Sequence, residues 1–262
     1  MTLATPHPHG TFCWPELATT DAAAATKFYS ALFGLTIFDA SPSPEMRYWI
    51  LQQNGKDAAA VYQMAEEQKA MMPSAWTIYV AVPNAREAAV KARELGATVM
   101  MEGIDVMDLG SLSVIQDPTG AVFAVWETKT HKGATAMGTV GTFCWAELNT
   151  NDTARAKDFY TKMFPWKAKE STNPEMPYTE WVLNGQEIGG LMKIDPAWGE
   201  VPPHWNLYFM TDNVDATVAK ATTLGATTCV PPMDIPNVGR FAVLMDPTGA
   251  AFSVFQMAAG HK

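Results

Sequence analysis

The stretch Gly10-Thr11-Phe12-Cys13-Trp14 recurs 131 residues later as Gly141-Thr142-Phe143-Cys144-Trp145. A second stretch, Asp-Pro-Thr-Gly-Ala at residues 117–121, recurs 129 residues later at residues 246–250. An offset this constant is the signature of a tandem repeat, so the chain is predicted to contain two copies of one folding pattern. Each position can therefore be compared with its partner in the other copy.

The length and composition fit a globular protein with two domains. The 262 residues divide into predicted domains at 1–131 and 132–262, each large enough for its own core. The net charge of −9 and the absence of a basic run argue against nucleic acid as a partner. No apolar stretch approaches the roughly 20 residues that span a bilayer, so no membrane partner is expected. The chain start lacks the apolar core of a secretory signal, and the three cysteines lack C-x-x-C spacing, so we expect a cytoplasmic protein.

Each copy begins with a short aromatic strand, followed by a helix and three further strands. Asp21 and Asp152 are placed to cap these helices, because a carboxylate there accepts the free amides of the first turn. The pattern restarts at Trp76 and at Trp205, with a second helix and three more strands in each copy. The Asp-Pro-Thr-Gly stretch is typical of the turn before the last strand. The chain is therefore predicted to be an α+β protein of four βαβββ units, or modules, two in each copy.

This arrangement resembles the vicinal oxygen chelate superfamily, which includes glyoxalases, bleomycin-resistance proteins and extradiol dioxygenases. The resemblance covers essentially the whole chain and rests on the module order, on the helix that runs into Phe28-Tyr29, and on the late Asp-Pro-x-Gly turn. The paired Cys-Trp-x-Glu-Leu strands are similar to those of tandem glyoxalase-like members, a mycobacterial culture-filtrate antigen among them. The resemblance implies two glyoxalase-like domains, each a cup-shaped, eight-stranded mixed sheet around a small-molecule ligand. Dimers are common in the family, which makes a homodimer a further expectation.

The same resemblance supplies a test for a metal ion. Metal-binding members hold the ion with histidine and carboxylate side chains on the first, fifth and eighth strands of a domain. Counted from the helix-capping and turn aspartates, those places hold Trp14, Thr77 and Ala124 in the first copy and Trp145, Asn206 and Ser253 in the second. These side chains cannot replace imidazole and carboxylate around a divalent ion. We therefore predict a protein with no metal and no other cofactor, which puts metal-assisted glyoxalase or dioxygenase chemistry in doubt.

Two carboxylates stand beside the paired tryptophans. Side chains two apart on a strand share a face, so Glu16 should lie beside Trp14, and Glu147 beside Trp145. A carboxylate between aromatic rings should have a raised pKa, which makes both residues candidates for acid–base chemistry. The alternative is that each is tied to a strand neighbour and is structural. The residues predicted to line the cavities are Phe12, Trp14, Glu16, Thr77, Tyr79, Phe143, Trp145, Asn206, Tyr208 and Ser253.

The second copy carries additional polar side chains. His204 stands on the same strand as Asn206 and Tyr208, and Arg240 lies before the second Asp-Pro-Thr-Gly turn. Because a guanidinium binds carboxylates and enolates, we name Glu147, His204 and Arg240 as the candidate catalytic set. In the alternative interpretation, His204 is a surface or capping residue and Arg240 anchors a loop.

Two interpretations of the function follow. In the first, which the missing metal ligands and the aromatic lining favour, the protein binds or sequesters an aromatic or amphipathic small molecule, as bleomycin-resistance members do. In the second, it is a metal-independent glyoxalase-like lyase or isomerase that uses Glu147 or Glu16 for acid–base chemistry. A third and less favoured interpretation is a metal-dependent glyoxalase or dioxygenase with displaced ligands, such as Glu16, Glu147 and His204.

Overall fold

A computed structural model describes residues 5–172 and 177–258 of the chain. The first repeat contains, in chain order, β1 (Phe12–Thr19), α1 (Ala22–Phe33), β2 (Thr36–Asp39), β3 (Tyr48–Gln53), β4 (Lys56–Gln63), α2 (Glu66–Met71), β5 (Ala75–Val82), α3 (Ala85–Glu94), β6 (Thr98–Val106), β7 (Gly110–Gln116) and β8 (Val122–Thr128). The second contains β9 (Phe143–Thr150), α4 (Thr153–Met163), β10 (Lys167–Glu170), β11 (Thr179–Leu183), β12 (Gln186–Lys193), the short 3₁₀ helix η1 (Pro196–Trp198), β13 (His204–Met210), α5 (Val214–Thr223), β14 (Thr227–Ile235), β15 (Gly239–Met245) and β16 (Ala251–Met257).

The main helices begin where the sequence places their caps. The carboxylate of Asp21 accepts a hydrogen bond from the N–H of Ala24, at 2.9 Å, and the carboxylate of Asp152 accepts one from the N–H of Arg155, at 3.0 Å. Both predicted caps are confirmed. Helix α2 was not predicted from the sequence, because it buries no side chain and therefore shows no apolar stripe. No helix in residues 5–172 and 177–258 is long and apolar enough to cross a membrane.

Each repeat forms one eight-stranded mixed sheet. The strand order is β2-β3-β4-β1-β5-β8-β7-β6 in the first and β10-β11-β12-β9-β13-β16-β15-β14 in the second. Within the first sheet, β1 and β4 are parallel, as are β5 and β8, whereas β2–β3, β3–β4, β6–β7 and β7–β8 are antiparallel. The predicted α+β fold of four βαβββ modules with two eight-stranded mixed sheets is confirmed.

The chain also divides into two compact units, and each unit combines modules from both repeats. Unit 1 comprises the described residues of Met1–Trp14, Thr77–Gly133 and Trp145–Asn206. Unit 2 comprises those of Pro15–Trp76, Ala134–Cys144 and Leu207–Lys262. The sequence left open whether modules pack within a repeat or across repeats. Inside each unit, one module of the first repeat packs with one module of the second.

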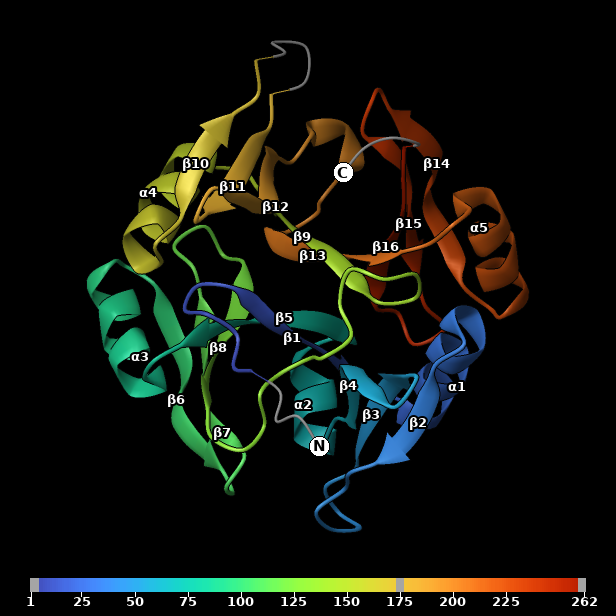
Figure 1. Cartoon of the computed structure of the whole chain (residues 1–262), viewed down its shortest axis with the longest axis horizontal. Helices are drawn as coiled ribbons and strands as arrows, with labels where there is room; N and C mark the ends of the chain where they lie inside the picture. The colour runs from blue at the N-terminus through green and yellow to red at the C-terminus, as the bar shows by residue number, and fades with distance from the viewer. Residues whose placement is uncertain (1–4, 173–176, 259–262) are drawn as a thin grey trace. The chain divides into compact units, whose positions relative to one another are not determined.

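Two helices from different repeats lie side by side in unit 1. Figure 1 shows α3 next to α4, and the ammonium of Lys91 donates to the carbonyl oxygen of Met163 at the end of α4, at 3.1 Å. Beneath them, the indole N–H of Trp205 donates to the hydroxyl of Tyr160, at 2.9 Å, which donates to Oδ2 of Asp117, at 2.8 Å. Burial and the charge of Asp117 raise the pKa of Tyr160 well above its usual value, so the phenol stays a neutral donor.

Unit 2 repeats this construction with the partner residues. Figure 1 shows α1 next to α5, and the ammonium of Lys220 donates to the carbonyl oxygen of Leu32, at 3.0 Å. The indole N–H of Trp76 donates to the hydroxyl of Tyr29, which donates to Oδ2 of Asp246, both at 2.9 Å. The buried chain from tryptophan through tyrosine to aspartate is therefore one core feature present in both units.

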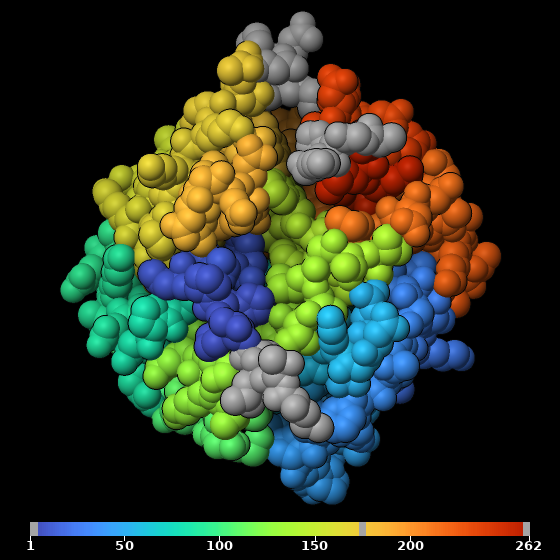
Figure 2. All heavy atoms as spheres, in the orientation of Figure 1, coloured from blue at the N-terminus to red at the C-terminus, as the bar shows by residue number. Residues whose placement is uncertain are grey.

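In unit 1, the chain start packs on β5, and the linker between the repeats packs on the first residues of β1. The N–H of Gly10 donates to the carbonyl oxygen of Ala81, at 2.8 Å, and the dark-blue segment from residue 5 lies at the surface (Figure 2). Gly133 has a φ of +91°, and a Cβ there would lie 2.6 Å from the carbonyl oxygen of Cys13 and 2.9 Å from His7. Only glycine allows this close approach, so residues 131–133 lie directly against β1.

Candidate functional site

Trp145 and Glu147 lie on one face of β9 in unit 1. β9 pairs with β12, where Ala146 is beside Gly189, and β12 pairs with β11, where Gly189 is beside Trp181. The Trp181 ring packs against a tyrosine of α4, with ring centroids 5.7 Å apart, so this row of residues faces the helix. Because side chains alternate along a strand, Trp145 and Glu147 point to the opposite face of the sheet.

Tyr178 joins these two side chains. Its hydroxyl donates to Oε2 of Glu147, at 2.9 Å, and accepts from the indole N–H of Trp145, at 3.0 Å. A Cβ on Gly190 would lie 1.7 Å from the tyrosine oxygen, so only glycine lets Tyr178 cross β12 at this point. Glu147 is 7% exposed. The result is a buried carboxylate held in a defined orientation by a directed chain of hydrogen bonds.

The first repeat has the equivalent pair in unit 2. The hydroxyl of Tyr48 donates to Oε2 of Glu16, at 2.7 Å, and Ala60 stands beside Glu16 where Gly190 stands beside Glu147. Burial and the charge of Glu16 raise the pKa of Tyr62 to about 12. Neither tyrosine is among the residues predicted from the sequence, although Tyr48 and Tyr178 are 130 residues apart and align in the repeat. Each glutamate is thus bonded to a tyrosine that reaches it across the intervening strand, β4 or β12, and this bond fixes its orientation.

The two matching indoles differ in how the protein covers them. Trp14 is 4% exposed, and the ring of His131 meets it edge-on, with centroids 4.6 Å apart. The indole N–H of Trp126 donates to the carbonyl oxygen of His131, at 3.1 Å, and fixes this linker residue in place. Trp145 is only half-buried. In unit 1, therefore, a residue of the linker covers the first indole, and the second keeps an accessible surface.

His204 begins β13 in unit 1 and is half-buried. Its Nδ1 lies 2.8 Å from the carbonyl oxygen of Pro202, and because a carbonyl only accepts, Nδ1 carries the proton of the neutral ring. Burial lowers the pKa of His204, and the bond to Pro202 opposes this only in part. The ring is therefore neutral near pH 7, with Nε2 as an acceptor, and supplies no positive charge.

We expect the His204→Gln variant to lose less stability than the wild type on acidification. The unfolded histidine binds a proton below about pH 6.5, whereas the folded ring resists protonation, so wild-type stability falls as the pH drops through this range. The difference in free energy of unfolding between the two proteins should change by less than about 1.4 kcal/mol per pH unit. Denaturant unfolding at about pH 7.5 and about pH 5.5 measures it. A difference that stays constant between the two pH values would contradict the prediction.

Arg240 lies among carboxylates in unit 2. Its Nε and Nη2 donate to the carboxylate of Asp215 at 2.9 and 3.0 Å, and its Nη1 donates to Asp234 at 2.9 Å. These bonds raise the pKa of Arg240 and lower that of Asp215. The guanidinium ties the start of α5 to β14 and β15, a geometry that matches the anchoring alternative. Arg240 and Glu147 belong to different units.

The other candidates of unit 1 are mostly core residues. The ring centroid of Phe12 lies 5.4 Å from those of Trp166 and Trp205, inside the aromatic core next to α4. Tyr79 meets the edge of Trp126, with centroids 6.5 Å apart. Tyr79 and Asn206 are buried, and Thr77 is half-buried.

Besides Glu16 and Arg240, three further candidates lie in unit 2, and these three are buried: Phe143, Tyr208 and Ser253. Tyr208 pairs with Ser253 across β13 and β16, and its ring centroid is 6.3 Å from that of Phe241. Among the residues predicted from the sequence, Trp145 and Glu147 are joined by hydrogen bonds through Tyr178. Glu16 is joined to Tyr48, which the sequence analysis did not name.

The residues at the superfamily's metal positions do not fit a divalent ion. The first-strand position holds an indole in both repeats, and at Trp145 the only nitrogen donates its hydrogen to Tyr178. Within the described part of the chain, no group of three or more His, Cys, Asp and Glu side chains is arranged to hold a metal. We therefore assign no step of any reaction to a metal ion.

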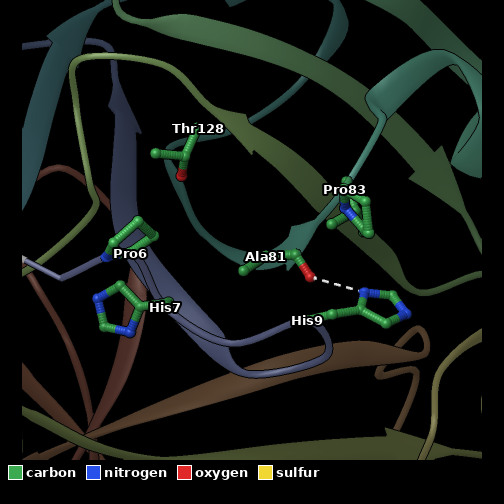
Figure 3. A pocket seen from close by; sticks show the side chains of 7 residues that line it. Pro6, His7, His9, Ala81, Pro83 and Thr128 are labelled. Carbon is green, nitrogen blue, oxygen red and sulfur yellow. Dashed lines mark hydrogen bonds between the residues drawn. The ribbon is translucent and has the colours of Figure 1, made fainter.

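Two shallow cavities occupy equivalent places in the two units. In unit 1, a cavity of about 220 Å³ lies between the segment from Pro6 to His9, the end of β5 and Thr128, with Nδ1 of His9 3.2 Å from the carbonyl oxygen of Ala81 (Figure 3). In unit 2, a cavity of about 160 Å³ lies between Val140, the end of β13 and the end of β16. Both are smaller than typical ligand pockets of about 300–1,000 Å³, and neither contains a predicted site residue.

Comparison with protein families matches both repeats. Residues 142–254 match the model of the Glyoxalase/Bleomycin resistance protein/Dioxygenase superfamily, and residues 15–126 match that of a glyoxalase-like domain. The Mycobacterium tuberculosis protein CFP32, described as a glyoxylase, is 39% identical over 252 residues, which cover 95% of each chain. The anthracycline biosynthesis protein DnrV of Streptomyces peucetius is 33% identical over 264 residues, which cover 96% of this chain and 95% of DnrV.

Solved structures share the fold at low sequence identity. The dioxygenase LapB of Pseudomonas sp. KL28 superposes with a TM-score of 0.64 at 10% identity, over 97% of this chain and 96% of LapB. The Mn(II)-bound glyoxalase of Novosphingobium aromaticivorans gives a TM-score of 0.64 at 14% identity, over 95% and 82%. Identities this low show the fold alone, and the chemistry has to come from the residues of this chain.

Proposed function

Because the chain belongs to the glyoxalase/bleomycin resistance protein/dioxygenase superfamily, we propose that its second repeat binds an aromatic or amphipathic small molecule without a metal ion. The proposed contact surface is formed by Trp145, Tyr178 and Glu147, and we call it the β9 face. Binding or sequestration is the function that this surface supports best, because it combines an apolar plane with one oriented polar group.

The hydrogen-bonded chain from Trp145 through Tyr178 to Glu147 carries this proposal. The half-buried indole offers a flat apolar surface against which an aromatic ring stacks. The carboxylate beside it, oriented by Tyr178, accepts a hydrogen bond from an O–H or N–H of the ligand. A ligand would thus be held by stacking over its plane and by a charge-assisted bond at its edge.

The difference between the repeats supports a site in the second one. The ring of His131 already covers Trp14, so a ligand at that indole would have to displace a residue fixed by Trp126. The half-buried Trp145 keeps part of its surface accessible. His131 therefore occupies, over Trp14, the place that a ligand would take over Trp145.

The relatives support a polycyclic ligand class. DnrV and DauV are described as anthracycline biosynthesis proteins, and anthracyclines are flat, hydroxylated quinones. Such molecules have both the aromatic plane and the edge hydroxyls that a ligand of the proposed β9 face needs. Daunorubicin is therefore a suitable first probe.

One observation favours a second candidate function, a metal-independent lyase or isomerase. The hydrogen bond from Tyr178 holds the Glu147 side chain as an acceptor in a fixed orientation, which suits a general base. In this candidate function, Glu147 removes a proton from the substrate, and the neutral His204 accepts a hydrogen bond through Nε2.

The Glu147→Gln variant separates the two functions. We expect it to bind daunorubicin with an affinity within about tenfold of the wild type, because the amide oxygen still accepts from Tyr178 and the indole still stacks. Quenching of tryptophan fluorescence measures the affinity. If the protein instead converts a ligand, mass spectrometry of the mixture should show a product, and the variant should lose turnover by about 100-fold or more.

The Tyr178→Phe variant is the matched control, since it keeps the ring and removes the hydroxyl. Under the binding function it weakens affinity modestly, because Glu147 and Trp145 both lose a partner. Failure of the wild type to bind daunorubicin or any other polycyclic hydroxyquinone would overturn the proposed function.

A further inference from the structure

One buried acceptor on β9 has no partner in the fold. Asn149 is 3% exposed, and its Oδ1 accepts no hydrogen bond from any residue of 5–172 and 177–258. Asn149 stands two residues after Glu147 on the same strand, so its side chain belongs to the β9 face. Its neighbour across the strand pair is Met192 of β12, whose thioether is no hydrogen-bond donor.

An orphan acceptor at a buried site is costly, and native proteins rarely keep one without a reason. The first repeat shows that the fold does not need it, because Ala18 occupies the equivalent place on β1 and is also 3% exposed. An alanine would therefore fill the position of Asn149 without an unpaired oxygen. The polar side chain is present only in the repeat whose indole remains accessible.

We propose that Oδ1 of Asn149 accepts a hydrogen bond from the ligand and makes the β9 face selective for molecules with two donor groups. This inference rests on the proposed binding function and adds the substrate class to it. Glu147 and Asn149 are both acceptors, and two steps along a strand separate them by about 6.7 Å. The matching ligand is a flat aromatic with an O–H or N–H at each of two opposite edges. One donor bonds the carboxylate, the other bonds the amide oxygen, and the plane lies against Trp145.

The test compares Asn149→Ala with the wild type on three probes that carry two, one and no donors: hydroquinone, its monomethyl ether and its dimethyl ether. We expect the wild type to bind hydroquinone more tightly than the dimethyl ether. Asn149→Ala should weaken hydroquinone binding by about five- to tenfold and leave the dimethyl ether unchanged. Isothermal titration gives each affinity. The thermal midpoint of ligand-free Asn149→Ala should equal or exceed that of the wild type, because the change removes an unpaired buried oxygen.

The reciprocal variant, Ala18→Asn, is the matched control. It places the same amide at the equivalent buried position of the first repeat, so it should lower the thermal midpoint and leave the preference among the probes unchanged.

If the wild type binds neither daunorubicin nor any other polycyclic hydroxyquinone, the proposed function is overturned, and this inference with it. If daunorubicin binds but Asn149→Ala discriminates among the probes as the wild type does, or if none of the probes binds, only the role of Asn149 is overturned. A lower thermal midpoint for Asn149→Ala would show that the side chain serves the fold, which also overturns it.

Discussion

Replacing Asp117 with alanine should lower the free energy of unfolding by about 3–5 kcal/mol, the largest stability effect that we expect from a single substitution. Oδ1 of Asp117 accepts from the N–H groups of Thr119, Gly120 and Ala121 at 2.6, 2.9 and 3.1 Å. Oδ2 accepts from the hydroxyl of Tyr160, at 2.8 Å, in the core of unit 1. Alanine removes this acceptor from the turn and from the Tyr160 hydroxyl at a position that is 3% exposed, although the N–H of Gly120 keeps its bond to the backbone carbonyl of residue 117, at 3.0 Å.

Denaturant unfolding followed by circular dichroism measures this effect. Asp117→Asn is the control, because the amide keeps one carbonyl oxygen for the turn and loses only part of the network. It should therefore cost less than the alanine variant. A loss below about 1 kcal/mol for Asp117→Ala would show that the turn is stable without its aspartate.

Replacing Trp145 with alanine should weaken daunorubicin binding by about 30- to 100-fold, the largest effect on affinity that we expect. The substitution removes the aromatic plane of the β9 face and the indole N–H that bonds Tyr178. Loss of a stacked ring and its buried area costs about 2–3 kcal/mol, which corresponds to this factor. Fluorescence of the bound drug measures the affinity without relying on the tryptophan that has been removed.

Trp14→Ala is the matched control, because Trp14 occupies the same place in the first repeat. It is 4% exposed and contacts His131, so its loss should lower the thermal midpoint by creating a cavity. The affinity of the folded variant for daunorubicin should stay unchanged. Equal losses of affinity in the two variants would contradict a site confined to the second repeat.

Much of the fold could be predicted because the same motifs occur in both repeats at nearly the same spacing. Asp21 and Asp152 cap their helices as expected, since a cap depends on a few adjacent residues. The packing of modules across the repeats could not be predicted. The hydroxyl of Tyr29 donates to Asp246, but Asp117 lies in a nearly identical turn. The sequence alone therefore does not show which of the two aspartates is its acceptor.

The candidate site was predictable only where it depends on spacing along one strand. Glu147 was expected beside Trp145 because the two residues alternate with Ala146. Tyr178 lies just before β11 and reaches Glu147 only because Gly190 has no side chain, a relation that requires the strand register. The partners of Arg240, on α5 and β14, likewise depend on the packing of the helix against the sheet.

Because each unit combines modules from both repeats, the two units are completed at different times during translation. Tyr29 and Asp246 are 217 residues apart, so at about 5–20 residues per second the tyrosine is made roughly 10 to 40 seconds before its acceptor. Tyr160 follows Asp117 by only 43 residues. All residues of unit 1 have therefore been translated once residue 206 is reached. Residues 15–76 of unit 2 can pack against their partner module only after the last strands are translated. Apolar surface exposed in that interval is prone to aggregation, so we expect the first module to be the most aggregation-prone segment during synthesis.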